Sequence, residues 1–251
     1  MLHKTPYRVF IGWDAAEMRA HVVAAASLRR QTVACVDVRR LAMSELIAKG
    51  LYTRPTRTLE NGQFWDDISG APMTTGHAIG RFFIPYLCGY EGWALFTDGD
   101  VLFRADVSEL FDLADQRYAV QVVQQTQRAT EVVKKSGQPQ TSYARKNWSS
   151  VMLFNCGHPA NSRLALDILN GWPGRDLHAF KWLDGDEHLG ALPPDWNYLV
   201  GVTEPKPNRV ALAHFTLGAP DIASHASDEF ADEWHHVAQL AGYQLQVEVG
   251  A

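Results

Sequence analysis

Apolar residues in the middle of the chain form two short runs separated by a polar break. Residues 93–96 read Trp-Ala-Leu-Phe and residues 101–103 read Val-Leu-Phe, and each run has the length of a buried strand segment. Asp98, Gly99 and Asp100 lie in the break. Because side chains alternate along an extended backbone, the two carboxylates point to the same side. The pattern predicts a buried strand that ends in a pair of like charges.

A shared divalent cation would make these two carboxylates favourable neighbours. Mg²⁺ and Mn²⁺ take carboxylate oxygens and leave coordination positions for phosphates or water, and Gly99 allows a ligand or the backbone to come close. A surface turn is the alternative, because Asp-Gly is a common turn signal. The flanking apolar runs favour a site, because ligands of open parallel sheets gather at the carboxyl ends of strands.

The amino-terminal part of the chain predicts a strand, a helix and a second strand. Residues 9–11 are apolar, Asp14 and Glu17 have the spacing of a capping box before a helix, and residues 33–38 read as the second strand. The glycine fingerprint of dinucleotide-binding folds is missing from the first loop. Trp13 and Asp14 are instead candidates for stacking on a base and binding a ribose; for Asp14, a helix cap alone is the alternative.

Two long segments interrupt the apolar pattern. Glycine and proline recur through residues 50–80, which read as a loop across the top of the domain, and residues 124–143 read as a polar excursion near the site. Arg81 follows the first of these segments in a short helix. It is the only cation of an apolar stretch, so its guanidinium either reaches the surface or faces an anion, and we favour the anion.

Two later apolar runs end in polar residues, as the aspartate strand does. Residues 151–154 are followed by Asn155, and residues 210–213 by His214. Between them lies an acidic cluster at residues 184–187. Such a charge run is often only a solvated loop, but bulky residues follow it at once and indicate a segment held against the rest of the protein. A lone histidine is more often structural than a ligand.

The composition is that of an ordinary folded protein. The 251 residues, 46% hydrophobic and 20% charged, suit one folded domain, and a net charge of −5 gives no reason to expect a nucleic acid partner. No apolar run approaches the roughly 18 to 20 residues of a membrane span, and no signal peptide is recognisable. The three widely spaced cysteines argue against a disulfide framework. We therefore expect a cytoplasmic protein, with peripheral contact at the inner membrane face as a variant.

Taken in order, these motifs resemble the nucleotide-sugar glycosyltransferases of the GT-A fold, most closely the family 8 group that includes glycogenin and bacterial galactosyltransferases. The resemblance implies an α/β fold, in which a single GT-A (Rossmann-like) domain over residues 1–251 has a mixed, mainly parallel central sheet flanked by helices. It implies a nucleotide-sugar and metal-binding half at 1–123, an acceptor and catalytic half at 124–220, and a closing helix and tail at 221–251. The matching features are the strand ending in Asp14, the helix from Arg81 to Pro85, the Leu-Phe-Thr-Asp98-Gly-Asp100 motif, the strand ending in Phe154-Asn155, the Asp186-Glu187 loop with Trp196-Asn197, and the late His214.

The same resemblance implies retaining transfer of a hexose from a nucleoside-diphosphate sugar, a UDP-sugar, to a hydroxyl of a carbohydrate, lipid-linked glycan or protein. It implies that Asp98, Asp100 and His214 bind Mn²⁺, with Mg²⁺ as the alternative. Asp186 and Glu187 fall where the family places a polar side chain beside the anomeric carbon. A carboxylate there would stabilise oxocarbenium-like charge or act as nucleophile, whereas front-side attack needs no protein nucleophile. The donor-binding residues implied are Trp13, Asp14, Arg81, Asp98, Lys146, Asn155 and Gly218.

The chain departs from the family pattern after His214. The family has a glycine three residues after this histidine and then Lys-Pro-Trp, whose lysine reaches the diphosphate; here Gly218 is four residues on and the lysine is missing. Lys146, Arg145 and Lys181 are candidate substitutes.

Other classes share parts of the pattern. Phosphohydrolases of the haloacid dehalogenase type also use Asp-x-Asp, but they require Gly-Thr after it, where this chain has Val101-Leu102. Nucleotide-sugar pyrophosphorylases carry an amino-terminal glycine-rich signature that this chain lacks. A non-catalytic sugar-nucleotide-binding protein is a further alternative, and turnover of the donor distinguishes it from an enzyme.

Overall fold

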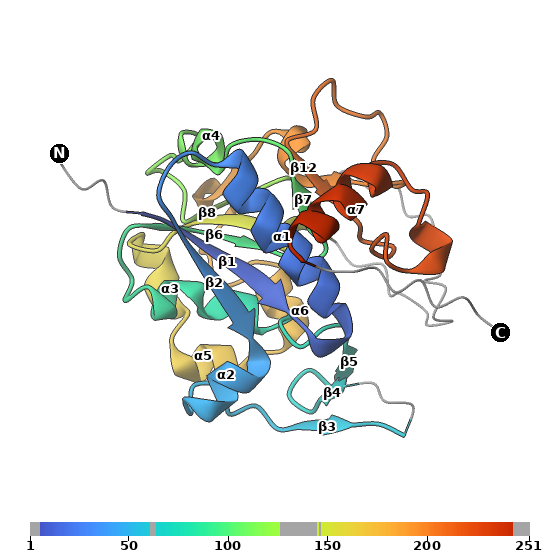
Figure 1. Ribbon diagram of the computed structural model, residues 1–251. Helices are drawn as coiled ribbons and strands as arrows, with labels where there is room; N and C mark the ends of the chain where they lie inside the picture. The colour runs from blue at the N-terminus through green and yellow to red at the C-terminus, as the bar shows by residue number, and fades with distance from the viewer. Residues whose placement is uncertain (1–5, 61–63, 126–144, 146, 243–251) are drawn as a thin grey trace.

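A mixed sheet forms the centre of the protein. The structure is a computed structural model that describes residues 6–60, 64–125, 145 and 147–242. The strand order is β10-β8-β9-β6-β1-β2, and β6, β1 and β2 are seen side by side in Figure 1. Only β9 runs against the others among these six strands. This confirms the predicted α/β class and the mainly parallel sheet. The strands are β1 (Tyr7–Trp13), β2 (Val36–Ala42), β6 (Trp93–Thr97), β8 (Val120–Val122), β9 (Val151–Asn155) and β10 (Leu189–Ala191).

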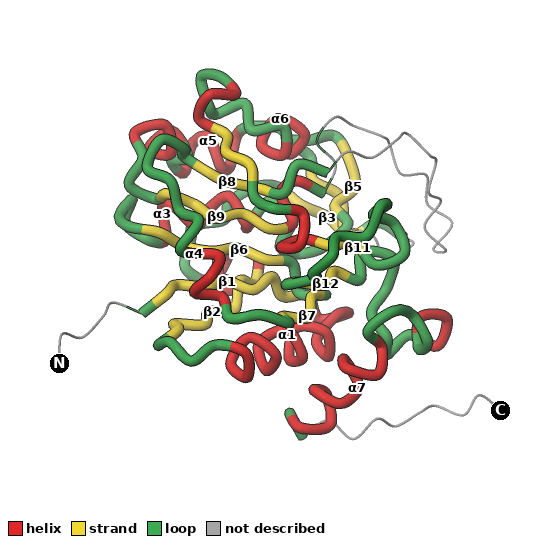
Figure 2. The backbone as a smooth tube through the Cα atoms, turned by 90° about the horizontal axis from the view of Figure 1, so that it is seen from above, coloured by secondary structure: helices red, strands yellow, loops and turns green. Residues whose placement is uncertain are grey.

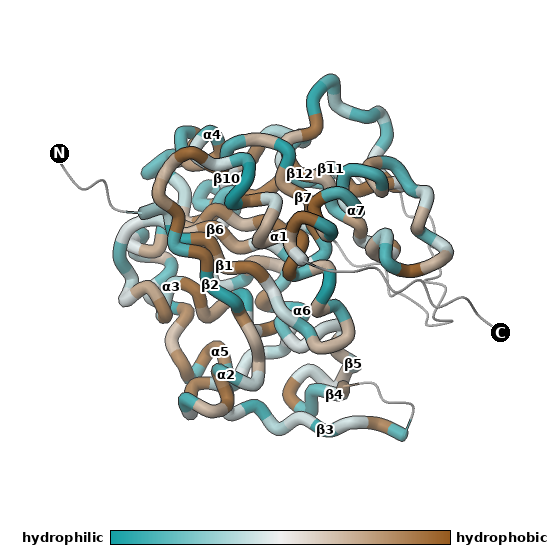
Figure 3. Tube along the Cα trace, viewed as in Figure 1, coloured by the Kyte–Doolittle hydropathy of each residue, from teal (hydrophilic) through white to brown (hydrophobic). Residues whose placement is uncertain are grey.

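Alternation along the central strands divides the core into two layers. Phe10 and Phe96 belong to one hydrophobic cluster, and Val9, Ile11 and Leu95 belong to a second cluster on the opposite face. Because both faces are covered, these strands read as continuous apolar runs rather than as alternating ones. Figure 3 shows hydrophobic residues, coloured brown, along β1 and β6.

Helices cover both faces of the sheet. The helix α1 (Met18–Gln31) crosses one face (Figure 1) and packs against α7 (Ala231–Leu240), the closing helix expected from the sequence. Figure 2 shows α5 (Leu166–Gly171) and α6 (Gly174–His178) on the side away from α1. None of the helices in the described ranges is long and apolar enough to cross a membrane. The remaining α-helices are α2 (Met43–Ala48), α3 (Ile84–Leu87) and α4 (Val107–Phe111).

Two small sheets flank the central one. The first has the order β11-β12-β7, formed by β11 (Tyr198–Leu199), β12 (Leu212–His214) and β7 (Val101–Phe103). It continues the aspartate strand beyond its break, and it brings the segment that ends in His214 beside that strand.

The second small sheet corrects the prediction of a loop over residues 50–80. An antiparallel meander of β3 (Thr56–Thr58), β4 (Phe64–Asp66) and β5 (Ala71–Met73) lies in this segment. Its strands are too short to show a period in the sequence. A buried ion pair between Arg54 and Asp66 attaches the meander to the rest of the protein. Most of the polar excursion expected at 124–143 lies outside the described residues.

The second strand also differs from the expectation. It begins at Val36 rather than Val33, whose side chain is 96% exposed. This strand forms an edge of the sheet, where polar residues are tolerated on the open side. Arg39 and Arg40 accordingly lie in it and place their guanidinium groups over the rings of Phe10 and Trp13.

Candidate active site at the carboxyl end of β6

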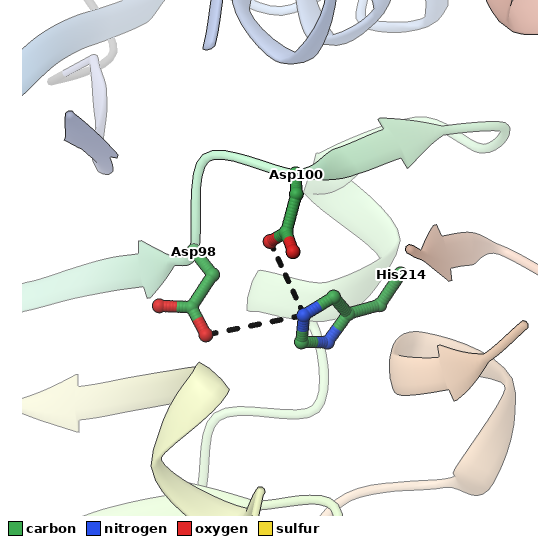
Figure 4. Close-up of side chains that lie close together, drawn as sticks. All are labelled: Asp98, Asp100 and His214. Atoms are coloured by element: carbon green, nitrogen blue, oxygen red, sulfur yellow. Dashed lines mark ion pairs between the residues drawn. The ribbon is translucent and has the colours of Figure 1, made fainter. Parts of the chain in front are cut away.

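Asp98, Asp100 and His214 meet at one edge of the central sheet (Figure 4). Asp98 follows β6, Asp100 precedes β7, and His214 ends β12. The antiparallel pairing of β12 with β7 places His214 opposite Val101, and the Phe215 N–H donates to the Asp100 carbonyl at 2.9 Å. One possible ligand atom from each side chain lies within 4.8 Å of the other two. We call these three residues the Asp-Asp-His cluster.

His214 presents one nitrogen to the two carboxylates. Its Nε2 lies 3.2 Å from Asp100 Oδ1 and 4.0 Å from Asp98 Oδ2, while its Nδ1 lies 3.0 Å from the amide oxygen of Asn197. That oxygen only accepts hydrogen bonds, so Nδ1 donates and Nε2 is left for the carboxylates or a metal. Burial disfavours the imidazolium, but the carboxylate of Asp100, then that of Asp98, outweighs burial and raises the pKa of His214.

Asp98 is held through its other oxygen. Its Oδ1 accepts from Arg81 Nη2 at 2.8 Å and from His77 Nε2 at 3.1 Å. Burial disfavours the carboxylate, but the charge of Arg81 and the hydrogen bond from His77 lower the pKa of Asp98 well below its usual range. Asp98 is therefore an anion at neutral pH, with Oδ2 directed towards the cluster.

Arg81 is a buried cation, as the sequence indicated, and the anion it faces within the chain is Asp98. Its Nη1 donates to the Ser149 carbonyl at 2.8 Å, and its guanidinium lies 4.8 Å from the centre of the Phe96 ring. These contacts fix Arg81 from two sides. Contact with a donor sugar or phosphate is a further role that the resemblance adds.

Two glycines allow the segments around the cluster to approach closely. A Cβ atom on Gly99 would lie 2.6 Å from the Gly12 carbonyl oxygen, and a Cβ atom on Gly12 would lie 2.6 Å from the His77 ring. His77 was not among the predicted site residues, because it lay in a segment interpreted as a loop. Its spacing of four residues from Arg81, about one helical turn, was the available signal.

Trp13 and Asp14 lie at the same sheet edge as Asp98. Parallel pairing of Ile11 with Thr97 brings the ends of β1 and β6 level. Asp14 accepts from the Ala16 N–H at 3.0 Å, which confirms its predicted role as a helix cap. Its second oxygen accepts from the Gly76 N–H at 2.7 Å. The nucleoside contacts of both residues stay predictions.

Asn155 does not belong to this edge. Because β9 runs antiparallel to β6, Asn155 pairs with Trp93 at the opposite end of the strand, and its side chain donates to Gln116. The expectation that this strand has the layout of the aspartate strand was wrong, since a single apolar run does not reveal its direction. The start of β9 lies at the cluster instead: the Ser150 carbonyl accepts from the Asp98 N–H at 2.9 Å.

The predicted catalytic pair is not part of the cluster. Asp186 and Glu187 are exposed in the turn before β10. Both oxygens of Asp186 accept from Arg145 Nη2, at 2.6 and 2.8 Å. Within the described part of the chain, no hydrogen bond or ion pair joins Asp186 or Glu187 to the Asp-Asp-His cluster.

The remaining predicted donor contacts have different positions. Gly218 ends a turn after His214, where its N–H donates to the Phe215 carbonyl at 2.8 Å, and its φ of 150° is one that glycine tolerates best. Of the candidate substitute cations, Arg145 is paired with Asp186 and Lys181 with Asp176 at 2.7 Å. Lys146 lies outside the described residues.

The sheet and its flanking helices define a GT-A fold of the kind found in glycosyltransferases. The bifunctional glycosyltransferase WbbM matches 95% of this chain and 50% of its own with a TM-score of 0.60 at 15% identity. The galactosyltransferase LgtC, solved in complex with donor and acceptor sugar analogues, matches 93% of this chain and 95% of its own with a TM-score of 0.55 at 12% identity. The chain thus spans half the length of WbbM, and at these identities the likeness shows the fold.

One curated relative shows the protein family. Protein CDI from Arabidopsis thaliana is 40% identical over 235 residues, which cover 92% of this chain and 85% of that protein. The chain therefore belongs to the family of Protein CDI. No family model matches the sequence.

Proposed function

We propose that this protein is a metal-dependent, retaining glycosyltransferase of the family 8 type, which transfers a hexose from a UDP-sugar to an acceptor hydroxyl. The observation that carries the proposal is the convergence of Asp98, Asp100 and His214 at the carboxyl edge of a GT-A sheet. This edge is where open α/β sheets bind their ligands.

The donor set of the cluster fits a divalent cation. Asp98 Oδ2, an oxygen of Asp100 and His214 Nε2 face one another, and the hydrogen bond to Asn197 fixes the imidazole in the orientation that a metal requires. Carboxylates suit both Mg²⁺ and Mn²⁺, and the imidazole favours Mn²⁺. A metal bound there would neutralise charge on the departing diphosphate.

The donor would lie across the ends of β1 and β6. Trp13 would stack on the base and Asp14 would bind the ribose, because both follow β1 at the edge that carries Asp98. Arg81 would reach the sugar or diphosphate, and Gly218 would let the backbone after His214 approach it. Lys146 is our first candidate for the missing lysine, since the two alternatives already have acidic partners.

Asp186 and Glu187 are the proposed groups for charge stabilisation at the anomeric carbon. Because Arg145 already holds Asp186, Glu187 is the better candidate of the two. We expect Glu187→Gln to lower turnover more than donor affinity, because a charge needed in the transition state contributes little to the bound donor. Equal turnover in Glu187→Gln, Asp186→Asn and the unmodified protein would exclude both carboxylates from the chemistry. Front-side attack, which needs no protein nucleophile, would then be the remaining mechanism.

The thermal midpoint in the presence of nucleotides and sugar nucleotides, with and without Mn²⁺, tests the proposal. A ligand at about 100 times its dissociation constant adds about 2.7 kcal/mol of stability. We expect a shift that needs both a UDP compound and metal, that disappears in Asp100→Asn, and that persists in Asp167→Asn, a matched change of an exposed aspartate on α5. A folded protein that no nucleotide stabilises would contradict the donor assignment.

A non-catalytic sugar-nucleotide-binding protein is the second candidate. The ion pairs of Arg145 and Lys181 favour it, because they occupy two cations that would otherwise replace the missing lysine. Hydrolysis of the donor without acceptor separates the two functions: the enzyme turns its donor over slowly, whereas a binding protein returns it intact. For the enzyme, we propose a cytoplasmic location and a carbohydrate, lipid-linked glycan or protein acceptor.

A further inference from the structure

His77 is a buried side chain at the Asp-Asp-His cluster with no role in the function proposed above. It is 1% exposed, and its Nε2 lies 3.1 Å from Asp98 Oδ1. Arg81 Nη2 approaches the same oxygen at 2.8 Å. The ring occupies the space that a side chain at Gly12 would otherwise take.

The two donors occupy one carboxylate oxygen completely. A carboxylate oxygen offers about two lone-pair positions, and at Asp98 Oδ1 one position accepts from Arg81 and the other from His77. The second oxygen, Oδ2, faces His214 at 4.0 Å. Asp98 therefore has a single oxygen available to a metal.

Only one of the two ring nitrogens of His77 has a hydrogen-bond partner within the described part of the chain. Its Nδ1 is buried and has no hydrogen-bond partner among the residues that the structure describes. Since buried polar atoms are rarely left unpaired in native proteins, a histidine that leaves one nitrogen unpaired needs a reason. The hydrogen bond from Nε2 to Asp98 Oδ1 supplies that reason, because it holds a carboxylate of the cluster in place.

We propose that His77 is a positioning residue that, together with Arg81, restricts Asp98 to one coordinating oxygen and thereby selects a small six-coordinate cation over Ca²⁺. Ca²⁺ takes about six to eight oxygen ligands and often uses both oxygens of a carboxylate, whereas Mg²⁺ requires a near-octahedral arrangement. Mn²⁺ also accepts octahedral coordination. This selectivity rests on the metal site of the proposed function.

The test measures metal binding to the whole chain without nucleotide. Mn²⁺ affinity is obtained from the electron paramagnetic resonance signal of the free ion, and Ca²⁺ affinity from competition with Mn²⁺. We expect His77→Leu to weaken Mn²⁺ binding by about 10- to 100-fold, as loss of an outer-shell partner does. The affinity for Ca²⁺ should fall less, so the ratio of the Mn²⁺ affinity to the Ca²⁺ affinity becomes smaller. His77→Gln, whose amide can donate to the same oxygen, keeps most of the preference.

Two further variants make the result independent of any single substitution. Gly12→Ala leaves His77 chemically intact but places a Cβ atom where the ring now lies, so it should narrow the preference as His77→Leu does. His235→Leu is the matched control, because His235 on α7 also has a buried Nδ1 without a partner among the described residues. It should bind both metals as the unmodified protein does.

The outcomes separate this inference from the proposed function. If the unmodified protein binds Mn²⁺ and Asp100→Asn does not, the metal site stands. In that case, an unchanged preference in folded His77→Leu and Gly12→Ala overturns the role of His77 alone. If His77→Leu does not fold, Gly12→Ala and His77→Gln decide the question. If the folded, unmodified protein binds no Mn²⁺, the metal site and the role of His77 fail together.

Discussion

Two buried arginines, each paired with an aspartate, use the same chemistry for different purposes. Arg54 pairs with Asp66, and Arg81 pairs with Asp98. Both side chains of the first pair are 0% exposed, whereas Asp98 in the second pair is 16% exposed. The difference lies in what each carboxylate has left to bind.

The Arg54–Asp66 pair is closed. Asp66 accepts from Arg54 and from the backbone and hydroxyl of Ser69, and Arg54 donates to the carbonyls of Leu169 and Trp172 at 2.9 and 2.8 Å. Each group therefore has its partners within the protein. This pair fastens the β3-β4-β5 meander to the chain around α5.

The Arg81–Asp98 pair is open. Arg81 and His77 occupy one oxygen of Asp98, and the second oxygen faces Asp100 and His214. An ion pair at this edge of the sheet whose carboxylate keeps one oxygen free of hydrogen bonds from the protein indicates a ligand-binding site. A pair whose groups are all hydrogen-bonded within the protein indicates a structural role.

Asp66→Ala should lower the free energy of unfolding by about 3–5 kcal/mol, because it leaves the charge of Arg54 buried without a partner. Urea denaturation followed by tryptophan fluorescence measures the loss. Mn²⁺ affinity of the folded fraction should not change, since the hydrogen bonds and the ion pair described for Asp66 join it to Arg54 and Ser69. A loss below about 1 kcal/mol, the range of exposed pairs, would show that this pair is not the fastening we describe.

Asn197→Ala should weaken Mn²⁺ binding by about 10- to 100-fold, because the amide oxygen no longer fixes the tautomer of His214. Asn197 also donates to Ser150 Oγ at 2.9 Å, so some stability is lost as well. Calorimetric titration with Mn²⁺ measures the affinity. Asn161→Ala removes another fully buried asparagine, at the opposite edge of the sheet, and controls for that loss. Equal Mn²⁺ affinities in the two variants would contradict the role of Asn197.

The open pair was the part of the site that the sequence predicted best. Two apolar runs around Asp-Gly-Asp indicated a buried strand that ends in two carboxylates at a ligand site, and the structure brings Asp98, Asp100 and His214 together as the resemblance implied. Residues that act across strands were harder to recognise. The direction of β9 depends on pairing between distant segments, so Asn155 was placed at the wrong edge. His77 lay among glycines and short strands with no readable period, although Gly12 and Gly99 marked the close approach that it uses.

His178 makes the region behind the open pair sensitive to acid. Ser149 links them: its carbonyl accepts from Arg81, and its hydroxyl lies 2.7 Å from His178 Nδ1. Burial, then the nearby charge of Arg81, lowers the pKa of His178 to about 3. The unfolded chain takes up this proton near pH 6.5, so between about pH 6.5 and 3 protons favour unfolding and stability falls as the pH falls.

We expect a loss of roughly 1–2 kcal/mol between pH 7 and 5 from this histidine, because in that range the unfolded chain takes up the proton and the folded protein does not. His178→Gln should flatten the dependence of stability on pH in that window. Asp98 acts in the same direction but only below about pH 4, since its pKa is also lowered. Urea denaturation at a series of pH values measures both windows. An unchanged slope in His178→Gln between pH 6.5 and 5 would contradict this assignment.

The smallest effect is expected for an exposed ion pair at the start of the acidic cluster at residues 184–187. Arg163 and Asp184 form an ion pair in which the side chains are 48% and 64% exposed. Water already solvates both groups and salt screens them, so Asp184→Asn should leave the free energy of unfolding almost unchanged. Denaturation at low and high salt concentration measures the difference, which should shrink as salt is added. A loss of unfolding free energy as large as that of Asp66→Ala would mean that burial does not distinguish structural ion pairs from surface ion pairs in this protein. The contrast between closed and open pairs would then have no physical basis.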